Sequence, residues 1–114
     1  MKRYFVYILA SRRNGTLYAG ITSDLEGRVL QHKLGEFEGF TKKYHVHKLV
    51  WFEEYGNVWD AIAREKQIKK WNRGWKIALI ERTNANWTDL FWGLVEPQQG
   101  EELRRRLRSL EPRR

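Results

Sequence analysis

The amino-acid sequence predicts a small α+β domain, because two kinds of segment alternate along it. Apolar segments rich in aromatic and β-branched residues, without helical periodicity, predict strands at residues 3–10, 16–22 and 47–55. Apolar residues that recur with helical spacing predict helices at 24–34 and 57–71. The length of 114 residues fits one domain of ordinary size. We place this domain in residues 1–95 and expect residues 96–114 to form a basic extension, either helical or disordered.

The first two strands are expected to form a β-hairpin. Asn14 and Gly15 between them are a strong signal for a two-residue turn, which would place Tyr7 opposite Thr22. Side chains alternate between the faces of a strand, so Tyr7 and Tyr18 share one face in this register and in every register shifted by two. Two tyrosines on one face of a sheet are commonly packing residues, and the pair alone does not identify a site.

The first helix is expected from about Asp24 to Leu34. Ser23 and Glu26, three residues apart, match a capping box, in which the serine oxygen accepts a backbone N–H and the glutamate reaches back to the cap. The polar, glycine-containing segment 36–46 after this helix is expected to be a loop.

Two side chains with chemical potential lie at the edge of the apolar stripe of this helix. Leu25 and Val29 define the stripe, and Arg28 and His32 lie four residues apart beside it. An amphipathic boundary of this kind is common, so an ordinary packing role stays open. As functional groups, Arg28 is suited to hold a phosphate by two parallel hydrogen bonds, and His32 to accept or relay a proton near neutral pH.

The second helix, expected from Asn57 to about Trp71, carries one carboxylate on its apolar face. At 100° per residue, Glu65 falls among the apolar positions Val58, Ala61, Ile62 and Ile68. A carboxylate there is costly unless it is paired or bound to a metal ion. Two interpretations stay open: a salt bridge to Lys69 or Arg28, and a ligand for Mg²⁺, which takes one or two carboxylates together with waters and phosphate oxygens.

Helical spacing returns at residues 75–80, and Asn84, Asn86 and Asp89 then indicate a loop. The C-terminal extension has a different composition. It contains six arginines, and its leucines recur at helical spacing, at Leu103, Leu107 and Leu110. This pattern suggests a marginal helix.

The charge is strongly positive, with 22 Lys and Arg against 14 Asp and Glu and a formal net charge of +8. Such a surplus fits a polyanionic partner such as nucleic acid, and it also fits a surface kept basic for solubility. The surplus is concentrated in residues 64–76 and in the C-terminal extension. The absence of cysteine excludes disulfides, a thiolate nucleophile and cysteine-based metal sites.

The sequence also speaks against a membrane protein and against a nucleotide cofactor. The basic and then apolar start resembles a signal peptide in outline, but the apolar run is short and fits a strand. No stretch approaches the roughly 18–20 apolar residues of a membrane span. Residues 15–22 copy the spacing of a phosphate-binding loop, but Ile21 replaces the lysine and the segment is a predicted strand. We expect a cytoplasmic protein, associated at most with the nucleoid.

Several short matches follow the motif order of one known family. Val6-Tyr7-Ile8 and Tyr18-Ala19-Gly20 correspond to two family tripeptides, with Val6 in place of glycine and Ala19 in place of isoleucine. The helix with Arg28 and His32 matches, as does the segment 63–69 around Glu65. Over residues 3 to about 90 the chain resembles the GIY-YIG nuclease superfamily, in particular its small stand-alone bacterial members. Residues 84–90 are similar to a late Asn-Pro-x-Trp-x-Asp-Leu segment, which assigns the family asparagine to Asn84, with Asn86 as second candidate.

The resemblance implies a three-stranded antiparallel sheet flanked by helices, with metal-dependent hydrolysis of a phosphodiester on one sheet face. In this interpretation Glu65 holds one Mg²⁺ or Mn²⁺ ion, and Arg28 binds the scissile phosphate. Tyr7, helped by His32, takes the proton of the attacking water, and Tyr18 positions the water or the phosphate. The sequence leaves open which tyrosine is the base, since a phenol with a pKa near 10 needs activation at neutral pH.

The remaining assignments are one orienting residue and a set of DNA contacts. The resemblance gives Asn84 the role of orienting a neighbouring group. The side chains expected to contact DNA are Lys42, Lys43, Arg64, Lys69 and Lys70. The expected partner is DNA, with RNA as an open alternative.

The leading functional hypothesis is a structure-selective or weakly sequence-specific DNA endonuclease in repair, recombination or processing. The alternative is a non-catalytic or weakly catalytic nucleic-acid-binding module that acts with a partner, because the domain is small and carries no separate specificity domain. A third interpretation is a scaffold that docks a partner helix on the C-terminal leucines.

Overall fold

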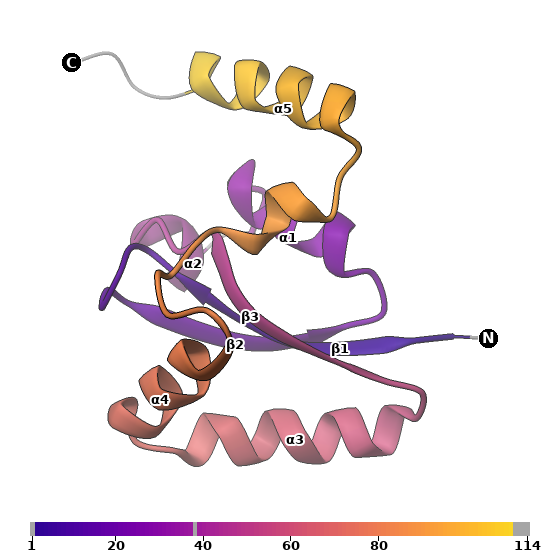
Figure 1. Cartoon of the computed structure of the whole chain (residues 1–114), viewed down its shortest axis with the longest axis vertical. Helices are drawn as coiled ribbons and strands as arrows, with labels where there is room; N and C mark the ends of the chain where they lie inside the picture. The colour runs from indigo at the N-terminus through magenta and orange to yellow at the C-terminus, as the bar shows by residue number, and fades with distance from the viewer. Residues whose placement is uncertain (1, 38, 111–114) are drawn as a thin grey trace.

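The computed structural model describes residues 2–37 and 39–110 and confirms the α+β fold with a three-stranded antiparallel sheet (Figure 1). The strand order is β2-β1-β3, with strands β1 (Tyr4–Ala10), β2 (Leu17–Thr22) and β3 (Lys48–Tyr55). The helices are α1 (Leu25–Lys33), α2 (Phe40–Lys43), α3 (Val58–Lys70), α4 (Arg73–Thr83), the 3₁₀ helix η1 (Leu90–Gly93) and α5 (Pro97–Ser109). Among the described residues, no helix has both the length and the apolar character needed to cross a membrane.

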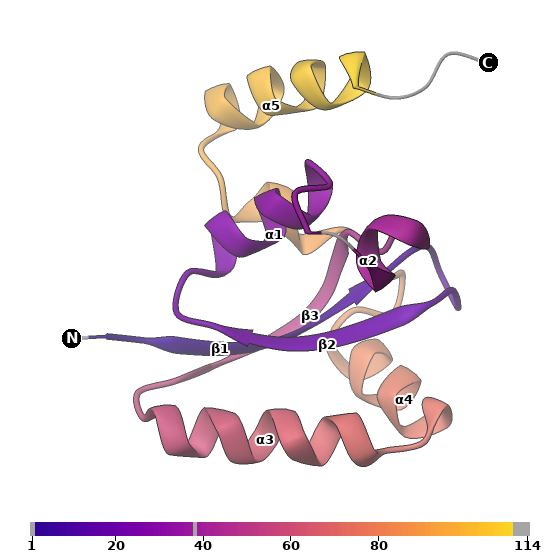
Figure 2. The same ribbon diagram turned by 180° about the vertical axis from the view of Figure 1, so that it is seen from behind.

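The sheet separates two hydrophobic clusters. Val6 and Ile8 pack with residues of α3 and α4, whereas Tyr7 and Leu9 pack with residues of α1 and η1. Figures 1 and 2 show the same layers: α3 and α4 on one side of the sheet, and α1, α2 and η1 on the other. The central strand β1 is therefore buried on both faces, as its continuous apolar sequence predicts.

The hairpin register differs from the predicted one by two residues. Tyr7 lies opposite Gly20, and the predicted partner Thr22 lies opposite Phe5. The turn is wider than two residues because the Ser11 hydroxyl accepts the N–H of Thr16 at 2.9 Å and closes a four-residue loop. A shift of two residues preserves the face of every side chain, which is why the expectation that Tyr7 and Tyr18 share a face is confirmed.

Two local expectations in the α1 region are wrong. The N-cap of α1 is Asp24, whose carboxylate accepts the N–H of Gly27 at 3.1 Å, and not Ser23. Aspartate is as good a cap as serine, and here it stands directly before the first helical residue. The segment 36–46, expected to be a loop, contains the short helix α2.

The C-terminal extension forms a helix over most of its length. Residues 97–109 are helical as α5, with Pro97 in the first turn, where its missing N–H costs nothing. Residues 111–114 lie outside the described part of the chain. In Figures 1 and 2, α5 lies on the far side of α1 from the sheet.

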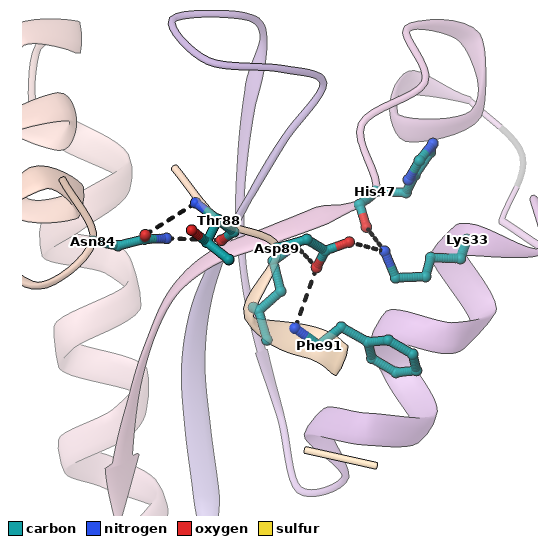
Figure 3. A network of polar contacts seen from close by, with 7 residues as sticks. Lys33, His47, Asn84, Thr88, Asp89 and Phe91 are labelled. Atoms are coloured by element: carbon teal, nitrogen blue, oxygen red, sulfur yellow. Dashed lines mark hydrogen bonds and ion pairs between the residues drawn. The ribbon is translucent and has the colours of Figure 1, made fainter. Parts of the chain in front are cut away.

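A buried ion pair connects α1 with β3 and η1 (Figure 3). Lys33, at the end of α1, places its Nζ 2.5 Å from Asp89 Oδ2 and 2.9 Å from the carbonyl oxygen of His47. The other carboxylate oxygen of Asp89 accepts the N–H groups of Leu49 at 3.0 Å and Phe91 at 3.2 Å. The Lys33 side chain is only 4% exposed. One carboxylate thus joins three elements that are distant in the sequence.

We predict that Asp89→Ala lowers the free energy of unfolding by about 3–5 kcal/mol, because it leaves a buried ammonium group without its counter-charge. Urea denaturation followed by circular dichroism measures this change. The control is Glu102→Ala, which removes an exposed pair with Arg106 at 2.9 Å and is expected to cost less than about 1 kcal/mol. Equal effects of the two substitutions would contradict the role given to Asp89.

Candidate active site

Tyr7 lies at the centre of the candidate site because Gly20 leaves space for its ring. A Cβ atom at Gly20 would lie 2.5 Å from both Cζ and the hydroxyl oxygen of Tyr7, so the phenol passes directly over the glycine. The ring of Tyr18 lies on the same face, with its centroid 6.4 Å from that of Tyr7. Tyr7 is 1% exposed, whereas Tyr18 is half-buried.

Helix α1 brings His32 to the Tyr7 hydroxyl. Leu25 and Val29 are buried and seat the helix on the sheet, as its apolar stripe predicts. His32 Nε2 lies 3.4 Å from the Tyr7 oxygen, and His32 Nδ1 lies 3.1 Å from the hydroxyl oxygen of Thr41 on α2. The imidazole therefore connects the phenol to α2.

Burial and Arg28 set the protonation states of this cluster. Burial, and then the nearby Arg28 cation, lower the pKa of His32 to about 4. The ring is neutral near pH 7, so one nitrogen donates and the other accepts. Burial also raises the pKa of the Tyr7 phenol, the charges of Tyr18 and Glu65 raise it further, and Arg28 lowers it as a cation and as a hydrogen-bond donor. The resting phenol is protonated, and Arg28 is the group that favours its ionisation.

A small hollow opens beside this cluster. Its volume is about 180 Å³, and it is lined by Tyr18, Arg28, His32, Phe37, Phe40 and Thr41. The Arg28 guanidinium stacks over the Phe37 ring at 5.3 Å, and the His32 ring lies 4.6 Å from the same ring. When the flat face of a guanidinium stacks on a ring, its N–H groups point outward in the plane and stay available to hydrogen-bond a ligand. The hollow therefore combines a cation, a phenol and an imidazole in a space suited to an anionic group.

Phe37, Phe40 and Thr41 were missed by the sequence analysis. All three come from the segment that was expected to be a loop. Thr41 is 7% exposed. Its hydroxyl contacts His32 Nδ1 and can either accept a hydrogen bond from this nitrogen or donate one to it, depending on the tautomer of the imidazole. The available signal was the helical spacing of three aromatic residues, Phe37, Phe40 and Tyr44, in an otherwise polar and glycine-containing segment.

Glu65 forms the salt bridge to Lys69 that was one of the two interpretations left open by the sequence. Its carboxylate lies 3.4 Å from Lys69 Nζ, and its side chain is 14% exposed. Its charge also acts on the Tyr7 phenol, although α3 lies on the other side of the sheet. The described residues contain no group of three or more His, Asp or Glu that could enclose a metal ion. A single carboxylate fits Mg²⁺, which keeps several waters and is completed by substrate phosphates.

The remaining predicted residues divide into two groups. Lys42 and Lys43 lie on α2 and Lys70 on α3, all of them exposed. Arg64 is held at the protein surface by Glu53 at 3.2 Å and by the ring of Trp71 at 5.2 Å. Arg64 therefore links α3 to β3 and to Trp71, a structural role that the sequence did not indicate.

Asn84 has a structural role in this arrangement. Its side-chain amide donates to the carbonyl oxygens of Val50 at 3.0 Å and Thr88 at 2.8 Å, and it accepts the N–H of Thr88 at 3.0 Å (Figure 3). Both amide hydrogens are thus engaged with backbone. Asn84 joins β3 to the segment before Asp89, and these bonds do not bring it to the tyrosine cluster.

The structure is a small α+β domain with a tyrosine–histidine–arginine cluster beside a hollow on one face of its sheet. The chain matches the family model of the GIY-YIG catalytic domain over residues 3–78 and belongs to this family. Its domain is therefore an endonuclease-type hydrolase domain in general terms, and its expected substrate is nucleic acid.

Several bacterial proteins are similar to this chain. A UPF0213 protein from Pediococcus pentosaceus is 33% identical over 87 residues, which are 76% of this chain and 90% of the relative. A UPF0213 protein from Staphylococcus aureus is 36% identical over 81 residues, which are 71% of this chain and 98% of the relative. The solution NMR structure of a UPF0213 protein from Bacillus halodurans is similar with a TM-score of 0.49 and 24% identity, covering 76% of this chain and 92% of that chain.

We predict that Gly20→Ala destabilises the domain by about 1–3 kcal/mol, because the new methyl group meets the buried Tyr7 ring. Thermal unfolding compared with wild type measures the loss. Gly56→Ala is the matched control, since a Cβ atom there has no neighbour within 4 Å, and a change of less than about 0.5 kcal/mol is expected. The close approach of Tyr7 to Gly20 is refuted if both variants behave alike.

We predict that the free energy of unfolding rises with pH between about pH 4 and 6.5 through His32. In this range the unfolded state binds a proton that the folded state does not, so the slope is positive. Urea titrations from pH 4.5 to 7.5 should show that His32→Gln flattens this rise by roughly 1–3 kcal/mol. His45→Gln, at an exposed histidine, should keep the wild-type slope. An unchanged slope in His32→Gln would show that His32 is not the group responsible.

Proposed function

We propose that the chain is a divalent-metal-dependent endonuclease that hydrolyses DNA phosphodiester bonds. We further propose that it is structure-selective or weakly sequence-specific and acts in DNA repair, recombination or processing. The observation that carries the proposal is the polar cluster at Tyr7: the His32 ring lies 3.4 Å from the Tyr7 hydroxyl, and His32, Arg28 and Tyr18 line one small hollow. Membership of the GIY-YIG family supports the reaction class, and the net charge of +8 supports a polyanionic substrate.

Arg28 is the proposed ligand of the scissile phosphate. It lines the hollow, and Phe37 orients its guanidinium by stacking. Its N–H groups match two phosphate oxygens, and they stabilise the charge that develops there in the transition state. Tyr18, which lines the same hollow, positions the phosphate or the attacking water.

Tyr7 is the proposed base, with His32 as its helper. Water attacks phosphorus, its proton passes to the Tyr7 oxygen, and the Tyr7 proton passes to His32 Nε2 while the bond from phosphorus to the 3′ oxygen breaks. This relay requires the tautomer in which Nδ1–H donates to the Thr41 hydroxyl, which the 3.1 Å distance allows. The low pKa of His32 opposes the transfer, and negative charge growing on the phosphate favours the resulting imidazolium.

Glu65 is the proposed ligand of one Mg²⁺ or Mn²⁺ ion. Such an ion would neutralise phosphate charge and stabilise the leaving 3′ oxygen. Lys69, which pairs with Glu65 at 3.4 Å, is the side chain that would turn from the carboxylate towards the DNA backbone. Lys42, Lys43 and Lys70 are proposed backbone contacts, and a protein partner at the C-terminal extension stays a proposal.

We predict that Glu65→Gln reduces the rate of nicking at least about 100-fold while circular dichroism stays unchanged. The assay uses bent, flapped, branched and single-stranded DNA, with matching RNA, in Mg²⁺ or Mn²⁺. Asp60→Asn removes an exposed carboxylate from the same helix and should keep the wild-type rate.

Two results of this assay would contradict the proposal. Nicking that survives both Glu65→Gln and Arg28→Ala would place the chemistry elsewhere. Nucleic-acid binding without cleavage in either metal would favour the alternative of a non-catalytic binding module.

A further inference from the structure

A second and larger hollow lies between α5 and the layer formed by α1 and α2. Its volume is about 800 Å³, within the roughly 300–1,000 Å³ range of ligand-binding sites in proteins. One wall is provided by α5, through Glu101, Arg104, Leu107 and Arg108, and by Leu110, the residue directly after the helix, which caps it. The opposite wall comes from residues 32–35, 41–42, 45 and 47–48, together with Asp89 and Trp92. We call this hollow the α5 groove.

The α5 groove has a surplus of positive charge. Lys33 and Asp89 also line it, but they neutralise each other at 2.5 Å. The other charged lining residues are the acid Glu101 and the bases Lys42, Lys48, Arg104 and Arg108. These bases come from three different elements and face one space, so the surplus is directed into the groove and complements a polyanion.

The α5 groove adjoins the candidate active site. His32 and Thr41 line both the groove and the smaller hollow that contains Tyr18 and Arg28. The two hollows are therefore neighbours that share this pair as a common wall. His47 also lines the groove, and its Nδ1 is buried without a hydrogen-bond partner among the described residues. Such an atom is costly unless a ligand or water satisfies it.

Helix α5 is held in place by its N-terminal half. Leu103 packs against the cluster around Tyr7 and Phe91, and the Arg104 guanidinium stacks on the Trp92 ring at 4.5 Å. Leu107 and Leu110 line the groove. Of the three leucines, Leu103 thus packs on the domain, whereas Leu110 is 63% exposed.

We propose that the α5 groove binds the sugar–phosphate backbone of the nucleic-acid strand on one side of the scissile phosphate. The inference rests on the proposed function, because it takes nucleic acid as the substrate. It also goes beyond the family, since the match to the GIY-YIG model ends at residue 78 and α5 begins at Pro97. The groove supplies substrate contacts that the catalytic domain by itself does not.

Four arginines of α5 provide a matched test. Arg104 and Arg108 line the groove, whereas Arg105 and Arg106 do not. The double variants R104Q/R108Q and R105Q/R106Q lose the same charge from the same helix. Binding of a fluorescent oligonucleotide is measured in the E65Q background without metal, over a series of salt concentrations, so that cleavage does not enter the result.

We predict that R104Q/R108Q weakens binding about 5- to 20-fold and reduces the slope of log K against log salt by roughly 1.4–1.8, the value for two phosphate contacts. For R105Q/R106Q we expect less than about a threefold change. Because Arg104 also stacks on Trp92, the variant K48Q/R108Q repeats the test with that contact intact and should lose affinity similarly.

The groove and the proposed function fail in different ways. Equal losses in the two arginine pairs, or none, would overturn the groove even if the wild type nicks DNA. A selective loss in R104Q/R108Q and K48Q/R108Q, with no nicking by the wild type in any metal, would support the groove and overturn the catalytic proposal.

Discussion

The buried pair of Lys33 and Asp89 is the constraint on which the arrangement of the site depends. Lys33 ends the helix that carries Arg28 and His32, and Asp89 is held by the backbone of β3 and η1. The Lys33 side chain is only 4% exposed, so moving its ammonium group away from Asp89 would leave a charge unpaired in a medium of low polarity. The pair therefore fixes α1 along the sheet and places His32 opposite Tyr7.

Burial of the site keeps the phenol proton on Tyr7 while no substrate is bound. The same loss of water raises the pKa of the Tyr7 phenol and lowers that of the His32 imidazole, so the proton stays on the phenol. Arg28 favours ionisation of the phenol but disfavours an imidazolium at His32. A phosphate bound at Arg28 would offset the effect of the Arg28 charge on His32, so the proposed base would become active only when the substrate is present.

The parts of the site that follow from periodicity could be predicted from the sequence. Tyr7 and Tyr18 share a face because strand alternation survives a two-residue error in register, and Glu65 was singled out by helical spacing. The parts that depend on side-chain packing across the fold could not. Thr41 lies in a segment whose polar, glycine-containing composition indicates a loop although it contains α2, and the opposing walls of the α5 groove come from segments far apart in sequence. Asn84 was assigned by resemblance, and its bonds to Val50 and Thr88 give it a structural task.

In the proposed mechanism, Glu65, Tyr7 and Arg28 act on one phosphate. Anomalous diffraction from crystals grown with Mn²⁺ and an oligonucleotide, using the Tyr7→Phe variant to slow cleavage, tests it most directly. The expected result is a Mn²⁺ peak about 2.0–2.2 Å from a carboxylate oxygen of Glu65, with a phosphate between that ion and the Arg28 guanidinium. A phosphate bound away from Arg28, with no Mn²⁺ at Glu65, would contradict it.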